Sequence, residues 1–173
     1  MKDFVYLASQ SPRRKQLLEQ IGVRYELLLA TPDEDAESLE RVIPGEAPLT
    51  YVKRVTQLKL EAAVKRMQAR GLKPAPVLCA DTTVALGRVI LGKPENAQDA
   101  VRILKTLSGQ THRVLTAVAV ASGRRRLLSV SVSKVTFAPM KLSEIKAYVA
   151  SGEPFGKAGA YGVQGMAAAY ISD

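Results

Sequence analysis

The sequence predicts an α/β fold in which helices flank a mixed β-sheet, and three observations support this class. Short apolar segments typical of strands alternate along the chain with longer segments of helical periodicity. Residues 76–80 are apolar without interruption, as expected of a strand that is buried on both faces. Glycine-centred turns at Gly87-Arg88 and Ser122-Gly123 predict hairpins. The sheet should therefore contain antiparallel as well as parallel pairs.

The predicted elements follow one another without a repeat or a linker. Strands are expected at residues 4–8, 25–30, 76–80, 83–86, 89–91, 113–121, 127–137 and 167–172. Helices are expected at about 12–21, 48–70, 96–107 and 143–150. Residues 31–47 and 157–165 should be loops. Ser11 and Pro12 form a typical helix start, and Gly22 and Gly71 are typical of positions just past a helix end.

Length and composition predict one domain, with or without two lobes. The chain has 173 residues, of which 47% are hydrophobic and 24% are charged, so it can bury a core. No apolar run approaches a membrane span, and residues 4–8 are too short for a signal-peptide core, so the interpretation is a cytoplasmic protein without membrane association. Cys79 and His112 are the single cysteine and the single histidine, which excludes an intramolecular disulfide and the usual zinc ligand sets.

The net charge of +9 indicates a polyanionic partner, either nucleotides, nucleic acid or an anionic surface. Weak nucleic-acid binding is one expectation from this charge. Aromatic residues make up only 5% of the chain, which leaves little for a platform that stacks bases. A basic, solvated surface without a partner is the plain alternative.

The segment Ser11-Pro12-Arg13-Arg14 is the first candidate for a phosphate site. Unpaired N–H groups and the helix dipole make a helix start locally positive, so two arginines there are unfavourable unless an anion binds. A docked phosphate would satisfy the N–H groups and both guanidinium groups together. The alternative is a capped helix start with solvent-exposed arginines.

Asp81 and Lys59 are the next candidates. Asp81 follows the buried strand 76–80, and it would lie at the carboxyl end of that strand, where α/β sheets bind ligands. It could act as a general base, bind a metal or cap a loop. Lys59 shares a helical face with Val52, Val55 and Ala62, so it interrupts an apolar stripe. It either reaches into a site or extends along the edge of the stripe toward solvent.

Two weaker signals complete the candidates. Lys93 lies in the turn Gly92-Lys93-Pro94 before a helix, where a lysine can meet a phosphate. The cluster Asp33-Glu34-Asp35 is either a solvated loop or a magnesium site.

Seven segments in order resemble the Maf family of nucleotide pyrophosphatases and cover nearly the whole chain. They are Leu7–Arg14, Asp33-Glu34, Arg54–Lys59, Ala80-Asp81-Thr82, Gly92-Lys93-Pro94, Leu107–His112 and Lys157–Gly165. The resemblance implies an elongated, curved mixed sheet with two lobes around a deep cleft. Family members usually continue beyond the position of Asp173, so the chain is expected to lack their C-terminal segment.

The resemblance also implies a reaction. Water attacks the α-phosphorus of a nucleoside triphosphate, and pyrophosphate leaves. Asp81 matches the general base, and further positions match residues that hold phosphates or a divalent cation, either Mg²⁺ or Mn²⁺, with Glu34 and Asp81 as the metal ligands. These further positions are Ser9, Arg14, Glu34, Lys59 and Lys93. A homodimer is a family-based expectation as well.

Three positions are expected to determine the substrate. Arg13, Thr82 and Gln164 match the subclass that acts on dTTP and UTP, and a glutamine amide can pair with the edge of a pyrimidine. Housecleaning of modified pyrimidine nucleotides would be the corresponding role. The alternatives are a purine-directed or 7-methyl-GTP pyrophosphatase, and a basic nucleic-acid-binding or regulatory protein without catalytic activity.

Overall fold

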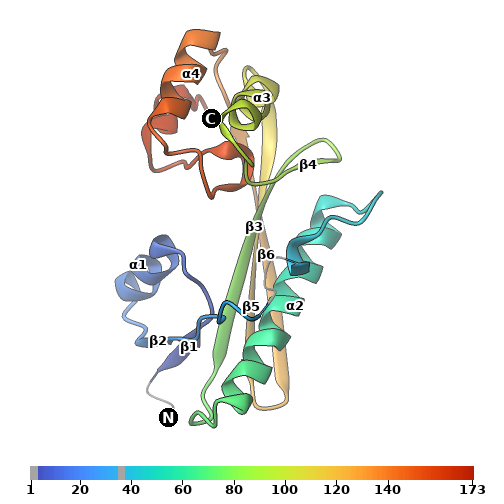
Figure 1. Cartoon of the computed structure of the whole chain (residues 1–173), viewed down its shortest axis with the longest axis vertical. Helices are drawn as coiled ribbons and strands as arrows, with labels where there is room; N and C mark the ends of the chain where they lie inside the picture. The colour runs from blue at the N-terminus through green and yellow to red at the C-terminus, as the bar shows by residue number, and fades with distance from the viewer. Residues whose placement is uncertain (1–3, 35–37) are drawn as a thin grey trace. The chain divides into compact units, whose positions relative to one another are not determined.

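The computed structural model describes residues 4–34 and 38–173, and it confirms a mixed sheet flanked by helices (Figure 1). Six strands are hydrogen-bonded in the order β2-β1-β3-β5-β6, with β4 paired to β3. The strands are β1 (Val5–Leu7), β2 (Tyr25–Leu27), β3 (Val77–Leu86), β4 (Val89–Leu91), β5 (Thr111–Ser122) and β6 (Arg125–Thr136). The helices are α1 (Pro12–Gln20), α2 (Pro48–Ala69), α3 (Ala97–Leu107) and α4 (Leu142–Ala150), with the 3₁₀ turns η1 (Ser38–Glu40), η2 (Ala158–Ala160) and η3 (Met166–Tyr170).

Contacts divide the chain into two compact units. The first comprises the described residues up to Asp81 together with Ala117–Val130, and the second comprises Thr82–Thr116 and Ser131–Asp173. Among the described residues, no helix is both long enough and apolar enough to cross a membrane.

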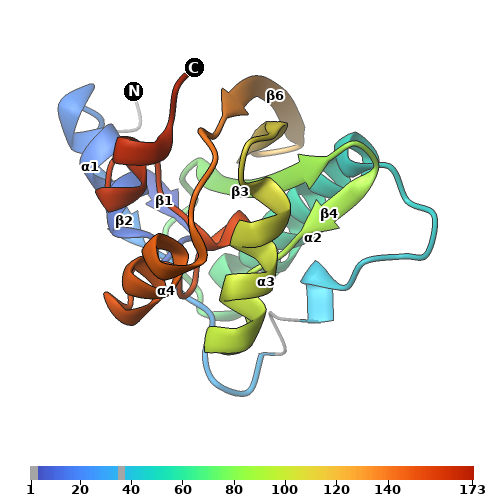
Figure 2. The same ribbon diagram turned by 90° about the horizontal axis from the view of Figure 1, so that it is seen from above.

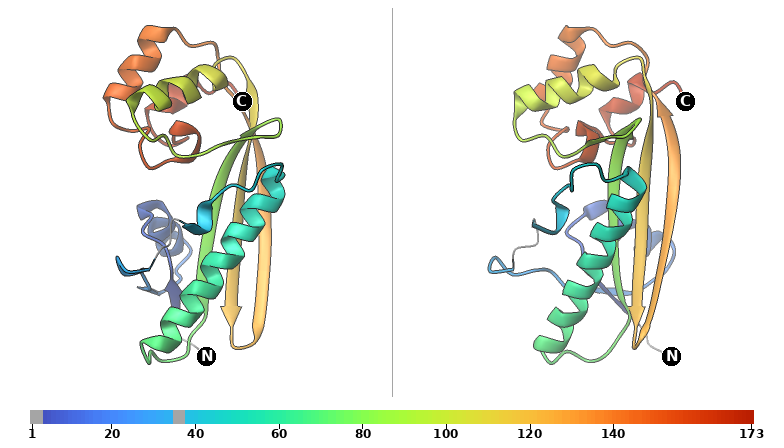
Figure 3. Two further views of the ribbon diagram at one scale, coloured as in Figure 1. Left: turned by 45° about the vertical axis from the view of Figure 1, so that its right-hand side comes forward. Right: turned by 90° about the vertical axis from the view of Figure 1, so that its right-hand side faces the viewer.

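The first unit is built around the parallel pairing of β1 with β2 and β3, in which Leu7 pairs with Leu27 and Leu78. The long helix α2 packs along this part of the sheet (Figure 3). Its buried side chains, such as Leu60 and Ala63, join Val77 in one apolar cluster. Pro48 occupies the first turn of α2, as expected from its fixed φ, and Gly71 follows the helix with φ of 59°.

The second unit has its own apolar core between α3, α4 and the strands. Helices α3 and α4 lie side by side over this core (Figure 2). Ile103 and Leu104 of α3 and Ile145 of α4 are at most 2% exposed. Asn96 caps α3, because its side chain accepts a hydrogen bond of 2.9 Å from the Asp99 N–H. The predicted helix start at residue 96 is thus confirmed to within one residue.

Two predicted strand ends are wrong. The strand predicted to end at residue 80 continues as β3 to Leu86. Asp81 therefore lies inside this strand and not at its carboxyl end. The β-branched residues Thr82 and Thr83 suit a continuing strand. Strand β2 ends at Leu27 instead of residue 30, and beyond it the carbonyls of Leu28 and Leu29 accept hydrogen bonds from arginines of the α2 region.

The predicted final strand 167–172 is wrong as well. Met166–Tyr170 forms a 3₁₀ turn, and strand-like pairing is limited to an isolated bridge between Ile171 and Phe137. Three consecutive alanines in this segment have low strand propensity.

Candidate active site

The loop between β1 and α1 brings Ser9 and Arg14 together. Arg14 donates a hydrogen bond of 2.9 Å to Ser9 Oγ, and the Ser11 N–H donates one of 3.2 Å to the same oxygen. Ser9 is 8% exposed, so its hydroxyl is an interior anchor for the start of the helix. Ser11 has the extended backbone of an N-cap residue but makes no side-chain cap, and the first turn of α1 contains no acid. The helix start therefore keeps the positive character that the sequence predicted.

Lys59 lies between two carboxylates. Its Nζ donates to Asp81 Oδ1 at 2.6 Å and to Glu40 Oε1 at 2.7 Å. Asp81 comes from β3, Lys59 from α2 and Glu40 from η1, so three elements of the first unit meet here. The side chains of Lys59 and Asp81 are 21% and 12% exposed. Lys59 thus points into a charged cluster and not along the edge of the apolar stripe.

The electrostatics of this cluster follow from its partial burial. Burial lowers the pKa of Lys59, but the attraction of Asp81 and Glu40 raises it by more, and the net pKa lies above its usual value. Burial also lowers the pKa of Arg14, against the opposing attraction of Asp81 and Glu40. Arg14 therefore belongs to the same electrostatic neighbourhood as Lys59, and the cluster combines two cations with two carboxylates.

Tyr51 closes this neighbourhood on the α2 side. Its hydroxyl donates a hydrogen bond of 2.8 Å to the Glu40 carbonyl oxygen. Burial, with the fields of Asp81 and Glu40, raises the pKa of Tyr51 to about 12. The phenol consequently stays neutral and holds η1 close to α2.

Glu34 is engaged in a different ion pair. Its carboxylate accepts three hydrogen bonds of 2.6 to 2.8 Å from Arg66, and Arg70 lies 3.5 Å from it. The hydrogen bonds from Arg66 lower the pKa of Glu34 to about 2, although burial opposes this. Its predicted role at a metal stays a prediction. Asp33 is exposed, and Asp35 lies outside the described residues.

Arg13 lies in the first turn of α1 in the first unit and is half-buried. The other predicted residues, Thr82, Lys93 and Gln164, belong to the second unit. Thr82 Oγ1 lies 3.1 Å from Thr116 Oγ1 in a hydrogen bond, and Lys93 and Gln164 are exposed. Gln164 lies in a turn that is closed by a hydrogen bond of 3.1 Å from the Gly165 N–H to the Gly162 oxygen.

Glu40 was not found by sequence reasoning. It lies in the segment 31–47 that was predicted to be a loop, and its contact with Lys59 spans 19 positions, so no local pattern indicates it. Within residues 4–34 and 38–173, no group of three or more His, Cys, Asp or Glu side chains is suited to a metal ion. The carboxylates of Asp81 and Glu40 form a pair and not such a group.

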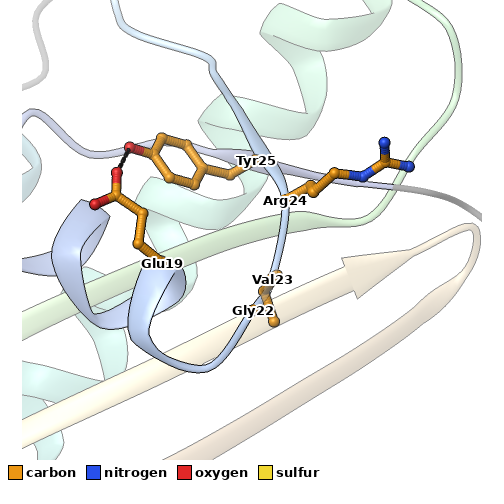
Figure 4. Close-up of a pocket in the computed structure, with 5 residues that line it drawn as sticks. All are labelled: Glu19, Gly22, Val23, Arg24 and Tyr25. Carbon is orange, nitrogen blue, oxygen red and sulfur yellow. Dashed lines mark hydrogen bonds between the residues drawn. The ribbon is translucent and has the colours of Figure 1, made fainter.

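A surface hollow between the end of α1 and β2 does not involve the predicted residues (Figure 4). It is lined by Glu19, Gly22, Val23, Arg24 and Tyr25. The Tyr25 hydroxyl donates a hydrogen bond of 2.8 Å to Glu19 Oε1, which joins two of the lining residues.

Known proteins resemble this chain in sequence and in fold. The chain is 68% identical to the dTTP/UTP pyrophosphatase of a Polaromonas species over 98% of its length and 84% of the relative. It is 64% identical to the dTTP/UTP pyrophosphatase of Albidiferax ferrireducens over 99% of its length and 86% of the relative. The Staphylococcus aureus Ham1 protein shares the fold, with a TM-score of 0.54 and 14% identity over 79% of this chain and 73% of that chain. The family profile described as "Maf-like protein" matches residues 4–173, so the chain belongs to the Maf family.

Proposed function

We propose that this protein hydrolyses nucleoside triphosphates, with dTTP and UTP preferred, to the monophosphate and pyrophosphate. The observation that carries the proposal is the contact between Lys59 on α2 and Asp81 on β3, with Arg14 held by Ser9 at the start of α1. Two cations beside a carboxylate suit a polyphosphate whose hydrolysis requires a base. Relatives at 68% and 64% identity carry the name dTTP/UTP pyrophosphatase, which supports the same reaction.

The chemistry assigns separate roles to the charged groups. A water molecule attacks the α-phosphorus and gives its proton to the Asp81 carboxylate. The bond from the α-phosphorus to the bridging oxygen breaks, and the electron pair leaves with pyrophosphate. Lys59 and Arg14 stabilise the negative charge that develops on the phosphate oxygens. Lys93 is proposed to contact phosphates as well.

The proposal includes a divalent cation, either Mg²⁺ or Mn²⁺, for which the first unit offers two neighbouring carboxylates. Asp81 Oδ1 and Glu40 Oε1 both contact Lys59 Nζ, so they can be no further apart than the sum of those two short distances. Mg²⁺ typically takes one or two carboxylates and completes its shell with water and phosphate oxygens. Asp81 and Glu40 would hold the ion, which would supply positive charge to the phosphates. Both oxygens of Glu34 already accept from Arg66, which makes Glu40 the better candidate beside Asp81.

Selectivity for the base is proposed to reside in Arg13, Thr82 and Gln164. The amide of Gln164 offers one acceptor and two donors, which can match the O4 and N3–H edge of thymine or uracil. A site built to bond such an edge discriminates against bases that present the reverse pattern.

A substrate panel tests the proposal. The wild-type protein and D81N would be incubated with dTTP, UTP, CTP, ATP, GTP and 7-methyl-GTP in the presence of Mg²⁺ or Mn²⁺. We expect monophosphate and pyrophosphate from dTTP and UTP, and a loss of turnover in D81N. D99N, which removes a carboxylate that pairs with Arg102 on α3, is the matched control and should stay active. Preference for 7-methyl-GTP or for a purine nucleotide would contradict the substrate assignment.

The metal assignment has its own test. E40Q and E34Q would be compared by titrating Mg²⁺ at fixed dTTP. If Glu40 holds the ion, E40Q raises the Mg²⁺ concentration for half-maximal activity and E34Q does not. The opposite result would assign that role to Glu34.

Two expectations about cellular context are part of the proposal. We infer that the protein acts in the cytoplasm, where nucleoside triphosphates are available, and that it forms a homodimer, which sedimentation analysis would measure. The net charge of +9 is the one observation that favours a nucleic-acid binder. Salt-sensitive binding to generic DNA without nucleotide turnover would support that alternative.

A further inference from the structure

The carboxylate of Glu153 binds the segment that follows Gln164. Glu153 lies in the loop after α4, and its Oε2 accepts a hydrogen bond of 2.9 Å from the Met166 N–H. Its Oε1 accepts a bond of 2.9 Å from the Tyr148 hydroxyl on α4. Burial raises the pKa of Glu153, but hydrogen bonds from Met166, Tyr148 and Ala167 lower it by more. The group is therefore held as an anion at the start of η3, where carboxylates are stabilising.

Gly165 lies so close to this carboxylate that a side chain at position 165 would displace it. A Cβ atom at position 165 would lie 2.1 Å from Glu153 Oε1 and 2.4 Å from its Cδ. Gly165 has φ of −103°, so the backbone itself does not favour glycine, and the effect of a substitution would come from displacing the Glu153 carboxylate. The backbone directly after Gln164 is consequently packed against one functional group.

The backbone before Gln164 is fixed by other contacts of the second unit. The turn of residues 162–165 is closed by the hydrogen bond from the Gly165 N–H to the Gly162 oxygen. Tyr161 is buried, and its hydroxyl lies 2.6 Å from His112 Nε2. Gln164 is thus an exposed side chain on a turn whose two ends are both held, and Glu153 is the charged group that holds one of them.

We propose that Glu153 is a positioning residue that sets the place of Gln164 and thereby the selectivity of the enzyme for its base. The inference rests on the proposed function, in which the Gln164 amide reads the pyrimidine edge. A hydrogen-bonding pair of this kind discriminates only when its donors and acceptors are correctly placed. Glu153 needs no contact with the nucleotide for this role.

The variant E153Q changes the chemistry without changing the size of the side chain. In E153Q the amide oxygen can still accept from the Met166 N–H, and the amide NH₂ can donate to the Tyr148 oxygen, whose hydroxyl both donates and accepts. Both hydrogen bonds then lose the negative charge of their partner, and this weakening should loosen the turn. We expect the ratio of kcat/KM for dTTP to that for CTP to fall by roughly 3- to 10-fold.

A double-mutant cycle separates positioning from general damage. The ratio of kcat/KM for dTTP and CTP would be measured in the wild type, E153Q, Q164A and the double variant. We expect Q164A to lower the ratio, and E153Q to have no further effect on the ratio in the Q164A background. G165A, which forces the same contact apart from the other side, should reproduce the effect of E153Q. E144Q is the matched control, because Glu144 also accepts a backbone N–H in this unit, from Lys141 at 2.6 Å, and it should leave the ratio unchanged.

Two results would overturn the inference. One is that Q164A lowers the ratio of kcat/KM for dTTP to that for CTP while E153Q leaves this ratio at the wild-type value. The other is that the fold-changes of this ratio in E153Q and in Q164A multiply in the double variant, as they would if the two residues acted independently. If the wild type turns over no nucleotide, the proposed function fails and the selectivity part of the inference falls with it. Hydrogen exchange of the Met166 amide then tests whether Glu153 holds the turn. Faster exchange in E153Q supports this role, and unchanged exchange refutes it.

Discussion

Replacing Lys59 with methionine removes the cation that two carboxylates share. Methionine keeps an unbranched apolar stem, so the packing of the α2 face should change little. Asp81 Oδ1 and Glu40 Oε1, which lie 2.6 and 2.7 Å from Lys59 Nζ, would then be close to each other without a cation between them. The variant should be destabilised because it leaves two partly buried negative charges uncompensated.

The magnitude follows from distance and exposure. A pair of unit charges 2.6 Å apart gains about 6 kcal/mol at an effective dielectric constant of roughly 20, before desolvation is subtracted. Exposed pairs contribute about 0–1 kcal/mol, while breaking a buried pair costs about 3–5 kcal/mol. The side chains of Lys59, Asp81 and Glu40 are 21%, 12% and 29% exposed, which places this cluster between the two limits. We expect a loss of about 2–3 kcal/mol, or roughly 4–12 °C in Tm for a chain of this size.

Thermal unfolding followed by circular dichroism at pH 5 and pH 8 would measure the loss. Repulsion between the carboxylates favours uptake of a proton in the folded variant, so the loss in K59M should be smaller at pH 5 than at pH 8. K59M/D81N should recover most of the stability. K53M, at an exposed position of α2, is the control and should stay within about 0.5 kcal/mol of the wild type. Equal losses at both pH values, or a double variant as unstable as K59M, would refute the reasoning.

The remaining predictions concern other parts of the fold. R66M should lower the free energy of unfolding by about 2–4 kcal/mol, because the Arg66 side chain is 8% exposed and pairs with Glu34; an unchanged urea midpoint would contradict this. The pKa of Glu34 is held at about 2, below its ordinary 4.5. The stability that this ion pair adds to the fold is therefore present at neutral pH, and it is lost as the pH falls through about 2. Burial lowers the pKa of His112, so the unfolded chain takes up the proton first and stability should fall as the pH drops below 6.5; H112Q should flatten this dependence in urea titrations. G159A should cost about 1–3 kcal/mol, because the backbone has φ of 71° and a Cβ would lie 2.8 Å from Val84 Cγ1; a calorimetric Tm equal to that of the wild type would refute the clash.

The features that the sequence predicted well are those that depend on neighbouring residues along the chain. The ends of α2 and α3 follow from Pro48 and Asn96, whose preferences act within one turn. Lys59 was recognisable because a charged residue interrupts an apolar stripe, and the structure pairs it with Asp81. The family was recognisable from motif order alone, and the comparison with known proteins confirms it.

Contacts between distant segments could not be predicted in this way. The pairs Glu40–Lys59 and Glu34–Arg66 span 19 and 32 positions, and they form only where the folded chain brings Glu40 and Glu34 to α2. Asp81 was placed outside its strand because a charge normally ends an apolar run. The structure shows instead that an acid is accommodated within β3, where Lys59 compensates its charge.

The most direct test of the account is hydrolysis of dTTP in water enriched in oxygen-18, with both products analysed by mass spectrometry. Attack at the α-phosphorus places the label in the monophosphate and leaves the pyrophosphate unlabelled, and the account predicts this result together with its loss in D81N. Label in the pyrophosphate, or formation of diphosphate and inorganic phosphate, would contradict the proposed reaction.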